Sequence, residues 1–227
     1  MTDCEKFLYA NDYVGAINCY RQKLNQSPDD PDLINGLGIS LTLSGQFEQA
    51  VTMFDRALAI DPRLTSCHYN KANCLLQIGQ DTRQPQLFRQ ALHHFEAIAD
   101  LERSNAVYFY NRGCTKKLLF DYFQDEKMLI DAIPDFKKAI SLDSGELPYH
   151  IAVIGGFEAL GRHRNDLEDL VSALMAYDHA LEEFPTAADI IVDKGALHAE
   201  IGMATGEVKH HTLAIECFTE ALALAPE

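Results

Sequence analysis

The stretch from Pro31 to Pro62, PDLINGLGISLTLSGQFEQAVTMFDRALAIDP, decides the fold of this 227-residue chain. Apolar residues recur every three or four positions on both sides of Gly45, which is the spacing of one face of an α-helix. Glycine favours the left-handed backbone that ends a helix, and proline cannot continue a helix. The stretch therefore predicts a helix-turn-helix pair whose turn lies near Gly45 and whose second helix stops before Pro62.

The second half of this stretch recurs along the whole chain. Each copy has an alanine, an apolar residue, two variable residues and then an aromatic residue. Successive alanines are 34 residues apart once and 41 residues apart four times, and equal intervals of this length do not arise by chance. The six copies run Ala16 to Tyr20, Ala50 to Phe54, Ala91 to Phe95, Ala132 to Phe136, Ala173 to Tyr177 and Ala214 to Phe218.

The second copy resembles the consensus of the tetratricopeptide repeat (TPR), a helix-turn-helix unit of about 34 residues. The residues that carry the resemblance are Ile34, Leu37, Gly38, Leu41, Ala50, Phe54, Ala57 and Pro62. The resemblance covers essentially the whole chain and implies an all-α, right-handed α-solenoid of about six TPR repeats in a single domain, 1–227. The repeats are expected at residues 1–29, 30–63, 64–104, 105–145, 146–186 and 187–227.

The last four copies depart from the family by seven additional residues each. These residues precede the alanine of the second helix, and three of the four inserts begin with an acidic residue, which favours a helix N-terminus. We therefore expect the second helices of repeats three to six to be extended by about two turns. The inserts are Gln84–Gln90, Asp125–Asp131, Asp166–Ser172 and Glu207–Leu213.

Two further features concern the ends and the course of the helices. Glycines recur near the expected turns, where they suit a left-handed helix end. Pro134 lies inside an expected second helix and predicts either a kink or a late start of that helix. The turn glycines are Gly45, Gly79, Gly161 and Gly202, and Phe120 stands at this place in the fourth copy.

The chain is acidic, with 19 Lys and Arg against 34 Asp and Glu, for a net charge of −15. Residues 143–227 hold 4 of the basic and 16 of the acidic residues, so −12 of the net charge lies there. Such a surface repels phosphate backbones, which argues against a nucleic-acid partner. The acidic face either aids solubility or is a docking surface for a basic segment of a protein partner.

The six cysteines are scattered and form no CxxC pair. A chain of this length can build a core without disulfides, so a reduced, cytoplasmic protein with free thiols is expected. No signal peptide and no apolar run of membrane-spanning length is visible, so membrane insertion is not expected. The sequence lacks the common catalytic and nucleotide-binding motifs, and its histidines form no ligand set, so neither an enzyme nor a metal or cofactor site is expected.

The resemblance also implies where a ligand binds. In TPR proteins the first helix of each repeat lines the concave side, with groove positions at the second, fifth, sixth, ninth and twelfth residues. The implied peptide-binding residues are Asn35, Tyr69, Asn70, Asn73, Tyr110, Asn111 and Lys117. Asparagine can pair with the backbone of an extended peptide, and tyrosine supplies contact area.

Structural roles are the alternatives for these residues. Asn70 and Asn111 would then fix the repeat geometry by bonding to neighbouring helices, and Tyr69 and Tyr110 would pack between repeats. In the last two repeats the same groove positions hold Pro148, Ile151, Ala152, Gly155 and Glu158, and then Asp189, Val192, Asp193, Ala196 and Ala199. Basic residues share the seventh position beside the groove, where their stems are expected to pack with the charge in solvent. They are Lys71, Arg112 and Lys194.

The expected function is that of a non-catalytic scaffold or adaptor that binds a protein segment on the concave face. A dedicated chaperone or assembly factor, and the TPR region of a longer chain with an enzymatic or other domain, are the alternatives. Capture of a chaperone's C-terminal tail is disfavoured, because the cations that such modules use are missing. The array ends without a polar capping helix, which predicts a longer natural chain or a homo-oligomer formed through the uncapped C-terminal repeat.

Overall fold

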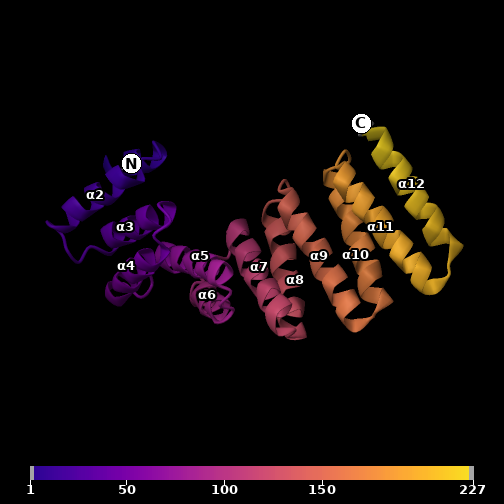
Figure 1. Cartoon of the computed structure of the whole chain (residues 1–227), viewed down its shortest axis with the longest axis horizontal. Coiled ribbons are helices and arrows are strands. Elements are labelled where there is room, and N and C mark those ends of the chain that lie inside the picture. Colours follow the sequence, from indigo (N-terminus) through magenta and orange to yellow (C-terminus); the bar gives the residue numbers. More distant parts are fainter. Residues whose placement is uncertain (1–2, 225–227) are drawn as a thin grey trace. The chain divides into compact units, whose positions relative to one another are not determined.

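The computed structural model describes residues 3–224, which form twelve α-helices (Figure 1). Helices that follow one another pack as antiparallel pairs, from α1 with α2 to α11 with α12. This confirms the prediction of an all-α chain of helix-turn-helix repeats. The helices are α1 (Asp3–Tyr9), α2 (Tyr13–Leu24), α3 (Pro31–Leu43), α4 (Phe47–Ile60), α5 (Thr65–Thr82), α6 (Gln86–Ala97), α7 (Ala106–Phe123), α8 (Glu126–Leu142), α9 (Leu147–Arg164), α10 (Leu167–Glu183), α11 (Ala188–Thr205) and α12 (Val208–Leu224).

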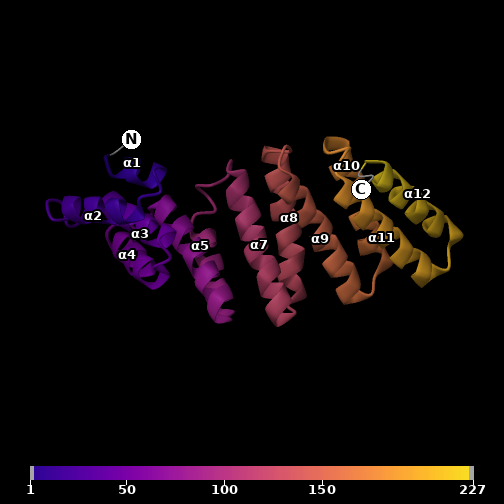
Figure 2. The ribbon, with the colours of Figure 1, turned by 45° about the horizontal axis from the view of Figure 1, so that its top comes forward.

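The helices belong to two compact units, Met1–Arg103 and Ser104–Glu227. The first unit contains α1 to α6 and the second contains α7 to α12. Within the second unit, α7, α8 and α9 lie side by side (Figure 2). Each unit is described by itself below, and the single domain expected from the sequence stays a prediction. The expected uncapped end, residues 225–227, lies outside the described residues.

The recurring alanine and aromatic columns form the core of each repeat. Ala50, Phe54 and Ala57 on α4 are completely buried, as are Ala132, Phe136 and Ala139 on α8. Glycines on the first helices face these rings: a Cβ atom at Gly38 would collide with Phe54, and one at Gly113 with Phe136. The small residue of the first helix therefore makes room for the aromatic ring of its partner helix.

In repeats four to six both helices are longer, whereas in repeat three only the first helix is. The first helix grows from 13 residues in α3 to 18 in α5, α7, α9 and α11. The second helix grows only from 14 residues in α4 to 17 in α8, α10 and α12, and α6 has 12. The predicted two-turn extension of the second helices is therefore wrong. In repeats four to six the paired helices lengthen together, because an overhang of one helix would leave its apolar face in water.

The expected turn glycines have two different roles. Gly45 is left-handed with φ of +77°, as predicted, but Gly79, Gly161 and Gly202 lie inside lengthened first helices. A Cβ atom at Gly161 would lie 2.7 Å from Cδ2 of Leu170, so this glycine lets the extended second helix pack closely. The left-handed residues of the lengthened pairs are Arg83, Gln124, Asn165 and Gly206.

Helix α8 passes through Pro134 without interruption. It begins after Asp125, whose carboxylate accepts a hydrogen bond from the backbone N–H of Lys127, so the helix does not start late. The Pro134 side chain is exposed. The ring therefore lies on the solvent side, and the helix loses the single backbone hydrogen bond that proline cannot donate.

Cys4 and Cys19 form a disulfide that joins α1 to α2. The expectation of free thiols is wrong for these two residues, because the helical hairpin places residues 15 apart in sequence next to each other. The free cysteines in the described part of the chain are Cys67, Cys74, Cys114 and Cys217. Among the helices of residues 3–224, the structure contains none that is long and apolar enough to cross a membrane.

Candidate functional site

The predicted patch takes residues from both units. In the first unit, Asn35 on α3 is only 7% exposed. Its Nδ2 donates a hydrogen bond to Oγ of Ser66 at 3.1 Å, and its Oδ1 accepts one from Nδ2 of Asn70 at 3.3 Å. Both partners lie on α5, so these amides join the first helices of two successive repeats. Asn70 therefore makes the contact expected of its structural role, a hydrogen bond to a neighbouring helix.

The tyrosines of the patch pack inside their units. The ring of Tyr69 meets Phe95 edge-on, with centroids 5.8 Å apart. In the second unit, the ring of Tyr110 lies between Tyr149 and Phe136, with centroid distances of 5.0 and 6.3 Å. Burial raises the pKa of Tyr110 to about 12. Inter-repeat packing is thus the observed contact of Tyr110, and its part in binding stays a prediction.

The remaining patch residues are half-buried. Nζ of Lys117 lies 2.9 Å from a carboxylate oxygen of Asp121, four residues later on α7, so its charge is balanced within its own helix. The backbone carbonyl of Asn111 accepts a hydrogen bond from Oγ1 of Thr115. Asn73 and Asn111 both lie on first helices, as expected, and nothing tests whether they touch a ligand.

The first helices of the second unit carry an exposed apolar column. Ile151 on α9 is 48% exposed and Val192 on α11 is 41% exposed. They occupy the same groove position as Tyr110 on α7. Val107, at another groove position of α7, is also exposed. We call the groove positions of α7, α9 and α11 the first-helix face, and apolar side chains gathered on it are typical of an interaction surface.

Small residues keep this face open. A Cβ atom at Gly155 would meet no other atom within 4 Å, so the space in front of α9 is free of neighbouring side chains. Cys114 and Ala196 occupy the same position on α7 and α11. Small side chains in one row allow the backbone of another chain to approach the helices closely.

Carboxylates lie along α9 and α11 of the first-helix face. Glu158 accepts a hydrogen bond from the hydroxyl of Tyr177 at 2.8 Å, and Arg162 pairs with Glu158 at 2.9 Å and with Glu200 at 2.8 Å. Among residues 3–224, neither Asp189 nor Asp193 has a cation within ion-pair distance. Along the two helices, these four carboxylates face one guanidinium, which leaves a surplus of negative charge.

The pKa of Asp193 is raised above its ordinary value. Burial is the largest cause, and the negative charges of Glu158 and Asp189 raise the pKa further. Glu158 on α9 and Asp189 on α11 repel the charge of Asp193, and a bound cation would offset this repulsion. The surroundings of Asp189 and Asp193 on α11 are therefore suited to a lysine or arginine side chain.

The basic residues beside the groove are ion-paired with second helices. Nζ of Lys71 lies 2.5 Å from Asp55, and that of Lys194 lies 2.6 Å from Asp178. Arg112 and Lys116 share the carboxylate of Asp135, whose side chain is 6% exposed. These basic side chains are paired with carboxylates of their own unit. The structure therefore differs from the expectation that their charges lie in solvent.

Sequence reasoning missed Arg162 and Glu200, which lie 38 residues apart. Both residues lie beyond the twelve positions that the family's groove pattern covers, and Arg162 belongs to the lengthened end of α9. The lengthened period was a signal for Arg162, but the sequence prediction placed the added residues in the second helices alone. The groove positions also include Ile151, Val192, Asp189 and Asp193. The sequence prediction favoured tyrosine and asparagine, so it did not name these four residues as ligand contacts.

Comparison with known proteins identifies the repeat. Residues 7–64 match the model of the tetratricopeptide repeat family. The peroxisomal targeting signal receptor of Eremothecium gossypii is 30% identical over 130 residues, which are 56% of this chain and 23% of that receptor. The receptor of Kluyveromyces lactis is 32% identical over 93 residues, 40% of this chain and 16% of the receptor. The chain thus spans less than a quarter of these relatives.

Solved structures share the fold over most of the chain. YrrB, described as a TPR protein with an unusual peptide-binding site, superposes with a TM-score of 0.67 at 17% identity, covering 92% of this chain and 93% of YrrB. A MamA fragment from Desulfovibrio magneticus RS-1 has a TM-score of 0.62 at 23% identity, covering 81% and 92%. At these identities the likeness shows the fold alone.

Proposed function

Since the chain has the fold of tetratricopeptide repeat proteins and carries their repeat in residues 7–64, we propose that it is a non-catalytic adaptor. It binds an extended segment of a partner protein along the first-helix face of α7, α9 and α11. Support comes from YrrB, whose description includes a peptide-binding site, and from the open space in front of Gly155. The proposed mode is binding by contact alone, without a covalent step.

One observation carries the choice of ligand: the exposed Val192, in the same column as Ile151 of α9, lies on α11 between the unpaired Asp189 and Asp193. The matching segment has apolar side chains for the column and a lysine or arginine for these two carboxylates. A basic residue also offsets the repulsion that raises the pKa of Asp193. Electrostatic attraction of this kind makes binding weaker as salt increases.

A selection of random peptides on the full chain tests this function. We expect enriched peptides that contain both apolar and basic residues. The double variant Asp189→Asn/Asp193→Asn should weaken their binding about tenfold, measured by fluorescence polarisation. Glu182→Gln/Glu183→Gln on α10 makes the same change in net charge at exposed positions and should leave binding unchanged. Selection of acidic peptides, or equal loss in both double variants, would contradict the proposal.

The two alternative roles use the same surface. A dedicated chaperone or assembly factor would hold one client there, and a TPR region of a longer chain would present the face to a partner of the whole protein. The cytoplasmic location likewise stays a prediction. The Cys4–Cys19 disulfide weighs against it, because reducing compartments keep thiols free.

We also propose that a second copy of the chain covers α12. Its exposed side carries Val208, Ile215 and Leu222, which are 76, 65 and 69% exposed. Apolar side chains that form a row on the exposed side of a helix favour further packing. This supports the prediction of a homo-oligomer formed through the last repeat.

A further inference from the structure

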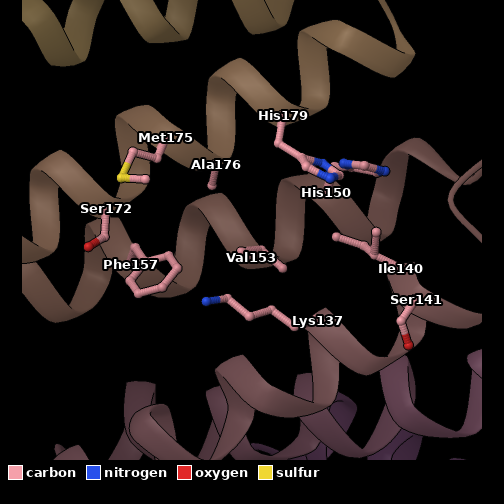
Figure 3. Close-up of a pocket in the computed structure, with 10 residues that line it drawn as sticks. All are labelled: Lys137, Ile140, Ser141, His150, Val153, Phe157, Ser172, Met175, Ala176 and His179. Carbon is pink, nitrogen blue, oxygen red and sulfur yellow. The ribbon is translucent and has the colours of Figure 1, made fainter.

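A pocket of about 510 Å³ opens on the side of α9 away from the first-helix face, between the second helices α8 and α10 (Figure 3). Its volume lies within the range of sites that hold small organic molecules. Apolar side chains form most of its surface, and Lys137, Ser141, Ser172, His150 and His179 are its polar members. The apolar members are Ile140, Val153, Phe157, Met175 and Ala176.

The corresponding space next to two other first helices, α5 and α11, is crossed by an ion pair. The acid of that pair follows the aromatic residue of a second helix, and the cation lies on the next first helix. Asp178 on α10 pairs with Lys194 on α11 in this way, at 2.6 Å. Asp55 on α4 and Lys71 on α5 repeat the arrangement in the first unit, at 2.5 Å.

At the pocket this ion pair is missing. Lys137 follows the aromatic Phe136 and so occupies the place of the acid. Val153, 41 residues before Lys194, occupies the place of the cation. The exchange leaves an ammonium group and an aliphatic side chain where neighbouring repeats have two opposite charges.

Lys137 consequently lacks the acidic partner that an ion pair would supply. Among residues 3–224, no carboxylate lies within ion-pair distance of its ammonium group. Nζ instead lies 4.8 Å from the ring centroid of Phe157, and Figure 3 shows the side chain reaching along the pocket toward that ring.

The opposite end of the pocket is closed by two stacked imidazoles. His150 is buried, with Nε2 3.0 Å from the carbonyl oxygen of Ser144. The ring of His179 stacks on it at a centroid distance of 5.3 Å. The pocket therefore has an aromatic wall at each end, an aliphatic floor from Val153 and a single unpaired ammonium.

We propose that this pocket binds a small organic acid with an apolar body. The body lies on Val153, Phe157 and Met175, and the carboxylate pairs with the ammonium of Lys137. The ligand thus supplies the carboxylate that Asp55 and Asp178 supply in the other repeats. A charge-assisted bond beside an apolar surface gives both orientation and selectivity for acids over neutral analogues.

Binding of 4-phenylbutyrate and of octanoate to the full chain tests the proposal, with 4-phenylbutanol as the neutral match. Isothermal titration is expected to give a dissociation constant at least fivefold lower for the acid than for the alcohol. In Lys137→Gln this preference should disappear. The neighbouring Lys138→Gln, which is exposed and does not line the pocket, should keep it.

A second variant separates loss of the pocket from loss of the fold. Val153→Glu places a carboxylate opposite Lys137, as in the other repeats, so the protein should remain folded and stop binding the acid. Amide chemical-shift changes on adding phenylbutyrate should map to α8, α9 and α10. The proposal is overturned if the wild type binds neither acid at millimolar concentration. It is equally overturned if Lys137→Gln retains the preference, or if the shifts map to the first-helix face.

Discussion

Nδ2 of Asn70 donates a hydrogen bond to Oδ1 of Asn35, 3.3 Å away, and this bond joins the first helices of two successive repeats. Asn35 completes the contact by donating to Oγ of Ser66. Polar groups that are this far from water must satisfy one another, because an unpaired buried amide is costly. The pair therefore specifies how α3 and α5 align, in addition to any role in binding.

Replacing Asn35 should weaken the first unit. Asn35→Ala removes the acceptor of Asn70 and the donor to Ser66, so we expect a loss of about 1–2 kcal/mol in the free energy of unfolding. Urea denaturation of the variant measures it. Asn73→Ala, on the same helix α5, is the control and should cost about 0.5 kcal/mol or less. Equal costs for the two variants would mean that the hydrogen bonds do not stabilise the repeat.

Two glycines of helix α9 should respond to alanine in opposite ways. Gly155→Ala places a Cβ atom in open space, so it should stabilise the helix by about 0.5–1 kcal/mol through helix propensity. Gly161→Ala places it 2.7 Å from Leu170, so it should lower the melting temperature. Calorimetry of both variants gives the comparison. An increase in stability for Gly161→Ala would show that α9 and α10 are loosely packed at this point.

The sequence predicted the paired helices well, because each alanine and aromatic column reports a local requirement of close packing. Phe54 and Phe136 are fully buried where the pattern places them. It predicted the lengthened repeats poorly. Gly161 was assigned to a turn, since glycine suits both a left-handed residue and a close helix contact. Only the partner, Leu170, distinguishes these two roles, and a partner across a hairpin is a property of the fold.

The candidate site shows the same limit. Groove positions from the family pattern include Ile151 and Asp193, but the pattern does not say which side chains are exposed or unpaired. The sequence predicted that the ring of Tyr110 offers contact area to a ligand, but in the structure this ring packs against Tyr149. The ion pair of Arg162 with Glu200 depends on where two lengthened helices lie next to each other. Such relationships require the three-dimensional arrangement.

Removing the Asp135 carboxylate should strongly destabilise the second unit. Its nearly buried carboxylate accepts hydrogen bonds from Arg112 and Lys116, and Asp135→Ala would leave two cations together with no anion. We expect a loss of about 2–4 kcal/mol in the free energy of unfolding, since the cations keep some access to water. Asp121→Ala breaks the exposed pair with Lys117 and should cost under about 1 kcal/mol. Similar urea midpoints for the two variants would contradict the argument.

Charges on α12 should dissociate the proposed homo-oligomer. Ile215→Glu/Leu222→Glu places two carboxylates on the exposed apolar side of the last helix, where a second copy would bury them unpaired. Sedimentation velocity at several concentrations should show association of the wild type and a monomeric variant. Ile130→Glu, at a site on α8 that is 40% exposed, serves as the control. A wild type that stays monomeric at high concentration would exclude this interface.

The first unit should lose stability in mild acid because of His94. Burial is the largest cause that lowers the pKa of this imidazole to about 4, and the charges of Lys71, His68 and His93 lower it further, against the opposing effect of Asp55. Its Nδ1 lies 3.0 Å from Nδ1 of His68, a contact that needs at least one neutral ring. The unfolded chain, with an ordinary histidine pKa near 6.5, therefore binds a proton more readily than the folded chain.

The sign of the effect follows from that difference. The stabilising contribution is present above about pH 6.5 and falls progressively as the pH drops toward 4. We expect the free energy of unfolding to fall by about 1–2 kcal/mol between pH 7 and 5. The loss is limited to this size because the His94 ring keeps some contact with water, which weakens its electrostatic interactions. Urea midpoints of the wild type should decrease over this range, and those of His94→Gln should change less. His93→Gln removes only the smaller contribution of an exposed neighbour and should flatten the slope less than His94→Gln does, so an equal flattening in both variants would assign the effect to another group.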